Sequence, residues 1–544
     1  MKEFVVAVLL STLTLQATAQ RSMSENVEIS WSPKLEERGT NTLEDIVGYD
    51  ETGFYVLKRQ ERGAGLTFLL GSNMGMRPHY LIEHFDNDMK PTKSKMLEMK
   101  HEGNKLDMEG VLYFQDRLLL FTTYTDKDAR VKQLFLEELD KKSLMVTSER
   151  IPLGEIDFEG HSKRNSGLFD YVISFNENKL FIYQSMPYDR RDYEKFAFSV
   201  FDENLNKLWS KEVTLPYSDK EFDVMRYRVD DAGNVYLLGR KFEQGRRLSR
   251  GGEANYKYHI LSYRNGGTDV QEYKVGIEGK FLNDMQLAVS ENSDLILAGF
   301  YSEDSPTSIS GSFYMTIDDR SGEVIKQSLK AFDTGFLTEN MRNRQARRVE
   351  KRVEKGKNVE LPNFDLRDLI RRADGGVVLV GEQYFVTVTT TPTVNGGMRT
   401  IHHYNYHDIM VVNIDPQGNI EWAHKIPKEQ TTTDDGGYFS SYALTIAGDK
   451  LYFVFNDHRD NLDAEPGRLK TFHNQRKSVV VLGVMDTNGN LEKKPLFINK
   501  EAGVLIRPKV CEQTGDYEMV VFGERGKHQR FARLRFGADG EARK

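Results

Sequence analysis

The chain has 544 residues, more than one ordinary hydrophobic core supports, so we expect several domains or one repeat array. Hydrophobic residues make up 39% of the chain and charged residues 29%, a composition typical of a soluble globular protein. The net charge of -7 argues against a chain that binds nucleic acid through an overall basic field.

The first residues have the features of a secretory signal peptide. Lys2 supplies a charged start, residues 4–15 form an apolar run, and the small residues at 17–19 form a cleavage site. A membrane anchor is the alternative, but the run is shorter than the roughly 20 residues that a spanning helix needs. We therefore predict a signal peptide over 1–19, a mature chain over 20–544, and export to the periplasm or the medium.

Two kinds of hairpin alternate along the mature chain. In the first kind, a polar turn leads into an apolar strand, as where residues 50–53 (Asp-Glu-Thr-Gly) precede residues 54–57 (Phe-Tyr-Val-Leu). In the second kind, a turn such as residues 415–418 (Asp-Pro-Gln-Gly) separates two further strands. Each kind occurs eight times, and Asp, Asn and Gly suit these turns because they adopt turn backbone at little cost.

Two hairpins per unit make four strands, and a single four-stranded sheet needs cover on both of its faces. Radial packing of successive sheets supplies that cover. The predicted fold class is therefore all-β, a single β-propeller of eight four-stranded blades. Seven blades are an alternative because the second unit lacks a glycine turn, and stacked β-sandwiches are another.

The N-terminal strand is predicted to complete the last blade. The eighth unit runs only as far as its third strand, at residues 531–536, and the turn after it. Residues 27–31 (Val-Glu-Ile-Ser-Trp) have the form of a fourth strand, because Trp31, Trp209 and Trp422 all fall at about the same position of that strand. Such pairing would close the ring and remove its open edges.

The turn pattern Asp-x-x-Gly-Asn before an apolar strand, as at residues 415–419, resembles the repeats of quinoprotein-type propellers. The whole mature chain resembles exported, uncharacterised β-propeller repeat proteins of Gram-negative bacteria. The adjacent cysteines that often belong to a quinoprotein cofactor cradle are absent, since Cys511 is the only cysteine. The resemblance therefore implies the fold without the cofactor site, and it implies no particular activity.

The loops of a propeller divide between two faces. Turns within the hairpins open on one face, whereas connections between hairpins and between blades open on the other, which we call the long-loop face. Nearly all turns of the first group are short in this chain, and every long insertion belongs to the second group. Since function usually lies on loops held by a rigid scaffold, we expect a ligand site on the long-loop face.

That face carries several insertions rich in basic and aromatic residues. A helical insertion near 336–357 has eight basic and two acidic side chains from Arg342 to Lys357, and a β-branched hairpin near 384–408 is predicted to project from its blade. Carboxylates, phosphates or sulfated sugars would suit such groups, although a charged helix can also be a solvated surface. The candidate ligand-binding residues are Arg190, Arg191, Arg246, Arg247, Arg347, Arg348, His403, Tyr404, His407 and Arg459.

Six of the eight units carry an aspartate where the innermost strand begins. Several carboxylates at one mouth of the channel would be suitable ligands for a hard cation such as calcium, and no other cofactor is predicted. The alternative is that each aspartate accepts backbone hydrogen bonds at a turn. These aspartates are Asp45, Asp107, Asp170, Asp223, Asp284 and Asp368.

The sequence contains no motif of the common serine hydrolases, zinc proteases or nucleotide-binding enzymes, and no catalytic residue is assigned. We therefore predict a monomeric binding or scaffold module whose long-loop face contacts a glycan, an envelope polymer or a protein partner, without nucleic acid or a membrane span. The alternative is a carbohydrate-active hydrolase or lyase with carboxylates converging at the central channel, for which Asp284, Asp368, Arg226 and Arg367 are the candidates.

Overall fold

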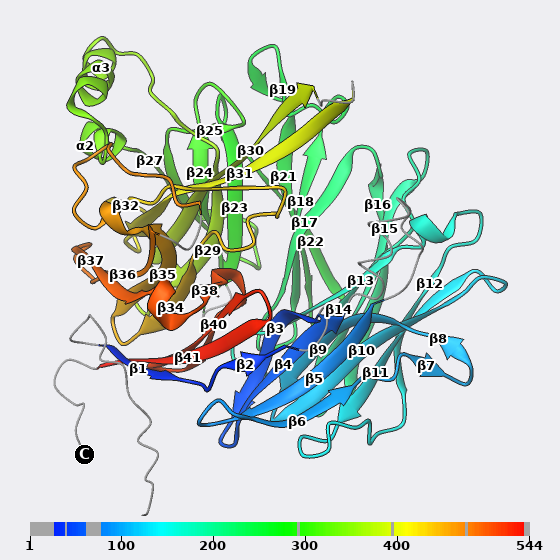
Figure 1. Cartoon of the computed structure of the whole chain (residues 1–544). Helices are drawn as coiled ribbons and strands as arrows, with labels where there is room; N and C mark the ends of the chain where they lie inside the picture. The colour runs from blue at the N-terminus through cyan, green and yellow to red at the C-terminus, as the bar shows by residue number, and fades with distance from the viewer. Residues whose placement is uncertain are drawn as a thin grey trace, which may run out of the picture.

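The computed structural model describes residues 27–37, 41–60, 78–290, 294–392, 397–473 and 477–537, so the predicted signal peptide lies outside the described residues. Eight antiparallel sheets, each with a core of four strands, follow one another around a ring (Figure 1). Each sheet is a meander whose strands follow the order of the chain, with small extra strands between two of them in blades 4 and 5, and the last sheet takes one strand from the N-terminal end. The predicted all-β propeller with eight blades is confirmed.

The blades are numbered in chain order. Blade 1 contains β3 (Asn41–Asp50), β4 (Gly53–Gln60), β5 (His79–Asp86) and β6 (Pro91–Met96). Blade 2 contains β9 (Asp107–Phe114), β10 (Arg117–Asp126), β11 (Val131–Leu139) and β12 (Ile151–Asp157). Blade 3 contains β13 (Leu168–Ile173), β14 (Lys179–Ser185), β15 (Tyr193–Asp202) and β16 (Lys207–Ser218). Blade 4 contains β17 (Phe222–Val229), β18 (Val235–Phe242), β21 (Tyr256–Arg264) and β22 (Asp269–Val275).

The second half of the ring repeats this arrangement. Blade 5 contains β23 (Phe281–Val289), β24 (Leu295–Ser302), β26 (Gly311–Ile317) and β27 (Val324–Ala331). Blade 6 contains β29 (Phe364–Arg371), β30 (Val377–Pro392), β31 (Met398–Ile414) and β32 (Ile420–Ile426). Blade 7 contains β34 (Ala443–Ala447), β35 (Lys450–His458), β36 (Ser478–Met485) and β37 (Leu491–Ile498). Blade 8 contains β39 (Glu512–Gly515), β40 (Glu518–Arg525), β41 (His528–Phe536) and β1 (Val27–Trp31).

Smaller elements decorate the ring. The additional strands are β2 (Leu35–Glu36), β7 (Lys100–His101), β8 (Asn104–Lys105), β19 (Ser249–Arg250), β20 (Glu253–Ala254), β25 (Ser308–Ile309), β28 (Leu361–Pro362), β33 (Gln430–Thr433) and β38 (Leu505–Ile506). Among the described residues, the helices are α2 (Thr334–Thr338), α3 (Asn343–Glu354) and α4 (Asn499–Ala502), with 3-10 turns η1 (Lys163–Asn165), η2 (Arg459–Asn461) and η4 (Pro508–Val510).

The first strand of each blade faces the central channel. Contacts between β3 and β9, between β13 and β17, and from β17 through β23 to β29 join the first strands of successive blades. The strand β39 contacts both β34 and β3, so the ring runs from blade 7 through blade 8 back to blade 1.

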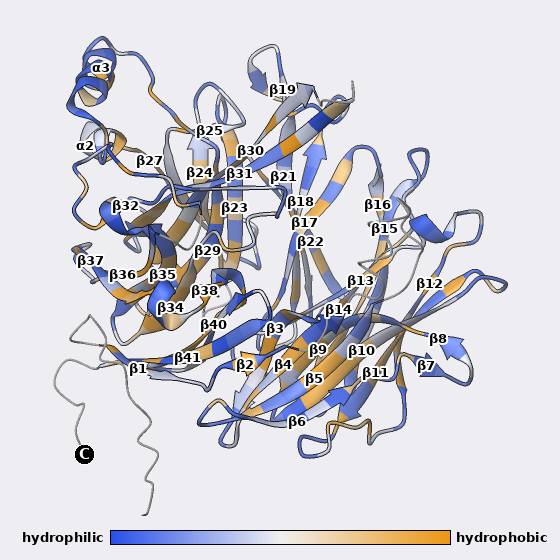
Figure 2. Ribbon diagram, viewed as in Figure 1, coloured by the Kyte–Doolittle hydropathy of each residue, from blue (hydrophilic) through white to orange (hydrophobic). Residues whose placement is uncertain are grey.

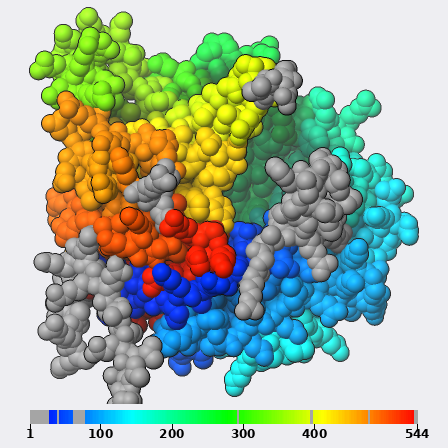
Figure 3. Space-filling view, in the orientation of Figure 1, coloured from blue at the N-terminus to red at the C-terminus, as the bar shows by residue number. Residues whose placement is uncertain are grey.

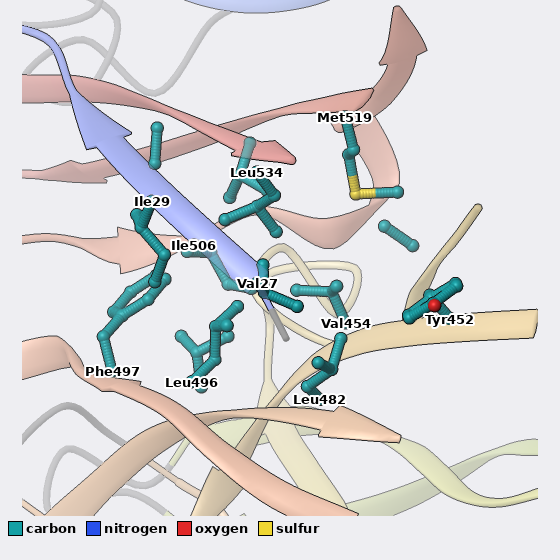
Figure 4. Packing of buried hydrophobic residues seen from close by; sticks show 14 of the residues in the cluster. Val27, Ile29, Tyr452, Val454, Leu482, Leu496, Phe497, Ile506, Met519 and Leu534 are labelled. Atoms are coloured by element: carbon teal, nitrogen blue, oxygen red, sulfur yellow. The ribbon is translucent and has the colours of Figure 1, made fainter. Parts of the chain in front are cut away.

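Blade 8 is completed by β1, which pairs antiparallel with β41 so that Ile29 lies opposite Leu534 and Trp31 opposite Ala532. Val27 and Ile29 are buried in a cluster with side chains of blades 7 and 8, including Leu482 (Figure 4). The predicted completion of the last blade by residues 27–31 is therefore confirmed.

Burial follows the position of a strand in its blade. Every residue of β24, a second strand, is buried, because neighbouring blades cover both of its faces. The outer strand β6 is exposed at nearly every residue. The apolar residues consequently concentrate in the middle of the blades, and the polar residues on loops and outer strands (Figure 2).

Two tryptophans link neighbouring blades. The indole N–H of Trp209 donates to the carbonyl of Gly233 in blade 4, and that of Trp422 donates to the carbonyl of Thr487 in blade 7. A Cβ on Gly267 or Gly489 would lie 2.7 Å from the respective indole ring. These turns therefore need glycine both for its left-handed backbone and for the close approach of the tryptophan.

Within the described residues, two large insertions depart from the ring on the long-loop face. The strands β30 and β31 have 16 and 17 residues, about twice the usual length in this ring, so their hairpin projects beyond blade 6 (Figures 1 and 3). The helix α3 lies in the connection between blades 5 and 6, and the left-handed Gly356 follows its end.

Candidate functional site

The ten predicted ligand-binding residues lie on five segments of the long-loop face. They are Arg190 and Arg191 between β14 and β15, Arg246 and Arg247 between β18 and β21, Arg347 and Arg348 on α3, His403, Tyr404 and His407 on β31, and Arg459 at the start of η2. All the arginines among them are exposed. The segments belong to blades 3 to 7, so the residues form several local groups on this face.

A hollow of about 500 Å³ lies on the long-loop face between blades 3 and 4. It contains one predicted ligand-binding residue, Arg246, and two of the predicted aspartates, Asp170 and Asp223. Its lining consists of Leu168, Phe169, Asp170, Tyr183, Ser185, Tyr188, Glu194, Phe222, Asp223, Val224, Met225, Tyr227 and Arg246. The starts of β13 and β17 and the connections within blades 3 and 4 position these side chains.

Arg246 is fixed by its own surroundings. Its guanidinium lies 2.7 Å from a carboxylate oxygen of Asp223, and its Nε–H donates to the carbonyl of Lys220 at 3.2 Å. The ring of Tyr188 lies 5.7 Å from the guanidinium carbon. The positive charge of Arg246 is thus compensated by Asp223, and an anionic ligand would have to compete with that carboxylate.

The hollow also holds a carboxyl pair that the sequence did not reveal. Glu194 on β15 and Asp219, which directly follows the end of β16, form this pair through a side-chain hydrogen bond, close to the point where Tyr193 lies opposite Ser218. Burial raises the pKa of Glu194 to about 9, and the hydrogen bond to Asp219 and the nearby charges of Asp219 and Asp223 add to the shift. Glu194 therefore keeps its proton at neutral pH. No local motif could have shown this, because the two residues are separated by the whole β15–β16 hairpin and meet only when it folds.

Aromatic rings form the remaining wall of the hollow. Tyr183 and Tyr227 stack with ring centroids 4.7 Å apart, and the Tyr227 hydroxyl donates to the Asp170 carboxylate. Leu168, Tyr188 and Met225 line the hollow while being exposed by 67%, 45% and 43%. The hollow thus offers accessible aromatic and apolar surface beside carboxyl groups.

The six predicted aspartates all lie on first strands, and three of them, Asp170, Asp284 and Asp368, bond to side chains or backbone of neighbouring blades. Asp284 of blade 5 accepts the backbone N–H of Leu366 in blade 6 at 3.1 Å and lies 3.3 Å from the Arg226 guanidinium of blade 4. Asp368 of blade 6 accepts the hydroxyl of Tyr442 in blade 7 at 3.2 Å. Loss of hydration within the protein raises the pKa of both carboxyl groups.

Within the described ranges, no three His, Cys, Asp or Glu side chains lie close enough together to hold one metal ion. Calcium at the channel mouth therefore stays a prediction without an identified set of ligands.

A second hollow, of about 630 Å³, lies at the foot of the projecting hairpin among blades 6, 7 and 8. It includes the predicted His403, together with Thr431 to Thr433 of β33, Phe439, Phe472 and His473. Neither Tyr404 nor His407 lines it.

No helix among the described residues is both long and apolar enough to cross a bilayer.

No protein-family model matches the sequence, and no curated protein matches it. Among solved structures, the chain is similar to a protein of unknown function from Bacteroides caccae, with 10% identity and a TM-score of 0.26 over 65% of this chain and 91% of that one. It is similar to the WD40 domain of SCAP from fission yeast, with 10% identity and a TM-score of 0.29 over 80% of this chain and 93% of that one. It is also similar to prolyl oligopeptidase B from Galerina marginata, with 8% identity and a TM-score of 0.37, covering 90% of this chain and 55% of that one. Similarities at this level carry no information about ligand or activity.

Proposed function

We propose that this protein is an exported binding module that holds a glycan in the hollow between blades 3 and 4. Export rests on the signal peptide predicted over 1–19. The proposal depends chiefly on one observation, that Tyr188 and its aromatic neighbours stand beside carboxyl groups while Asp223 compensates the charge of Arg246. A neutral sugar can bind there without breaking that ion pair, whereas an anion would have to displace Asp223.

The chemistry of the lining suits a polyhydroxylated ligand. Sugar hydroxyls donate hydrogen bonds, and the Asp170 and Asp223 carboxylates accept them. The apolar face of a sugar ring can pack on an exposed aromatic side chain such as Tyr188. The volume of about 500 Å³ lies in the range of small-molecule sites.

The test is calorimetric titration of the mature protein with neutral and sulfated oligosaccharides. We expect binding of a neutral glycan, and we expect Tyr188→Ala to weaken it about tenfold, equivalent to about 1.4 kcal/mol, because a packing surface is lost. Tyr193→Ala is the matched control, since Tyr193 is 57% exposed and does not line the hollow. Equal affinities for Tyr188→Ala and the unchanged protein would contradict the proposal. A sulfated ligand lost on Arg347→Ala and Arg348→Ala would instead place binding on α3.

A second candidate, a carbohydrate-active hydrolase, is favoured by the protonated state of Glu194. Glycoside hydrolysis needs one carboxylic acid and one carboxylate, and Glu194 keeps its proton beside Asp223. This arrangement would place the reacting carboxyl groups in the hollow rather than in the channel, where Asp284 and Asp368 bond to neighbouring blades. Glu194→Gln should then retain binding and abolish release of shorter sugars. If the unchanged protein released no shorter sugar from any glycan that it binds, this candidate would be excluded.

A further inference from the structure

The projecting hairpin has a strand edge that no other described strand covers. The pairing of β29 with β30 ends where Phe364 lies opposite Gln383, whereas β31 follows β30 as far as Pro392. On its other side, β31 is covered by β33 from His403 to Tyr406. Within the described residues, β30 therefore has a neighbour on one side only from Phe385 to Pro392.

Backbone hydrogen bonds show which residues of β30 present their polar groups outward. Tyr384, opposite Tyr406, donates its N–H away from β31, to the carbonyl of Asn363. His402, opposite Val388, accepts the N–H of Asp434 on the side away from β30. In an antiparallel pair the orientation alternates along the strand, so Val386, Val388 and Thr390 direct their N–H and C=O groups outward.

This edge lacks the features that normally prevent strands from pairing. Residues 384–391 (Tyr-Phe-Val-Thr-Val-Thr-Thr-Thr) contain no charge and no proline, and the six that follow Phe385 are all Val or Thr and all exposed. Natural proteins usually protect exposed edges with Lys, Pro or a bulge. Val386 and Val388 are 40% and 56% exposed, so apolar side chains accompany the unpaired backbone.

The identity of the partner follows from charge and symmetry. The chain carries a net charge of -7, so two copies repel each other over most of their surface. The projecting hairpin carries almost no charge, so it does not share this repulsion. Arg399 is the one charged residue in 385–392 and 397–401, and it lies 3.8 Å from Asp434. Val388 is the middle of the stretch from Phe385 to Thr391. A two-fold axis there would place Val388 opposite its own copy and Val386 opposite Thr390.

We propose that the free edge of β30 pairs antiparallel with the same edge of a second copy of this chain, forming a two-fold symmetric dimer through the projecting hairpins. Such an interface uses one patch on both subunits and closes on itself. It joins the two hairpins into one continuous sheet with backbone hydrogen bonds and an apolar contact between the Val388 side chains. No residue of the hairpin lines the hollow between blades 3 and 4, so the pairing does not depend on the proposed glycan binding.

The test measures oligomeric state by analytical ultracentrifugation of the mature chain over a range of concentrations. We expect a dimer fraction that rises with concentration. Val388→Pro should weaken association at least tenfold, because proline removes an outward N–H that β31 does not use. Val388→Thr keeps that N–H and the β-branched shape, and it should retain dimerisation. The proposal would be overturned if the protein stayed monomeric at every concentration. It would also be overturned if Val388→Pro and the unchanged protein had the same dissociation constant for dimerisation.

Charge exchange gives a second and stricter test. Val388→Lys places two ammonium groups opposite each other in the symmetric pair, and Val388→Glu places two carboxylates there. Each variant alone should be monomeric, whereas a mixture of the two should form a heterodimer. Failure of the mixture to associate, with both variants folded, would show that the edge receives a strand of another protein or none.

Discussion

Glu194 keeps its proton because burial and the neighbouring Asp219 raise its pKa from 4.5 to about 9. Between these values the folded state binds a proton that the unfolded chain has released. The free energy of unfolding should therefore fall as pH rises from about 5 to 9, with a contribution of at most about 1.4 kcal/mol per pH unit from this one residue. Glu194→Gln keeps a hydrogen-bond donor to Asp219 without a titrating proton, and it should remove this contribution.

Urea unfolding at several pH values from 5.5 to 8.5 checks this prediction. The Glu194→Gln variant should match the unchanged protein near pH 5.5 and be the more stable of the two at pH 8.5. Glu203→Gln, in the exposed turn between β15 and β16, is the control and should follow the unchanged protein throughout. Parallel profiles for all three proteins would show that Glu194 is ionised in the folded state.

At the scale of elements, a buried ion pair ties β30 to the chain that leads from blade 6 into blade 7. The Lys428 ammonium donates to Glu382 at 2.9 Å and to the Tyr406 carbonyl at 3.0 Å, and both charged side chains are fully buried. Ser441, just before β34, donates to the other carboxylate oxygen at 2.8 Å. Lys428→Met should lower the free energy of unfolding by about 3 kcal/mol, because it removes the buried cation from Glu382 and leaves only the partly exposed Arg367 guanidinium 3.4 Å away.

The double variant Lys428→Met, Glu382→Gln should recover much of that loss, since neither charge then remains. Urea unfolding provides the comparison. Lys494→Met is the matched control, because Lys494 lies 2.6 Å from Glu492 on the surface, where such pairs contribute less than about 1 kcal/mol. A double variant as unstable as the sum of its single variants would rule out the ion pair as the cause.

For the whole molecule, β1 decides whether the ring is closed. Ile29 is 2% exposed and packs with side chains of blades 7 and 8 (Figure 4). Ile29→Ala should lower the free energy of unfolding by about 2 to 5 kcal/mol. It should also increase aggregation, because a loosened β1 exposes the edge of β41.

Ile325→Ala provides the control for this change. Ile325 is 55% exposed on the outer strand β27, where truncation should alter stability by less than about 0.5 kcal/mol. Denaturant unfolding and light scattering measure the two effects. If both variants behaved alike, β1 would contribute nothing to closure.

The blades were predictable because their determinants are local. A turn such as residues 415–418 and the apolar strand beside it predict a hairpin from about ten residues of sequence. The repetition of such hairpins indicated the number of strands, and the three tryptophans identified the fourth strand of each unit that has one. The position of the aspartates on first strands was likewise accessible, because it is set by distance from a turn.

The candidate site could be predicted from the sequence only in part, because its contacts join residues far apart in the chain. The sequence placed Arg246 on an exposed loop, but only the packing of blade 4 shows that Asp223 compensates its charge. Glu194 meets Asp219 only when the β15–β16 hairpin folds, and Lys428 meets Glu382 across 46 residues of the chain. The sequence by itself determined the ring and its closing strand, since turns and alternation act locally. The tertiary structure alone decided which polar groups meet between blades, because those contacts arise only when separate sheets pack.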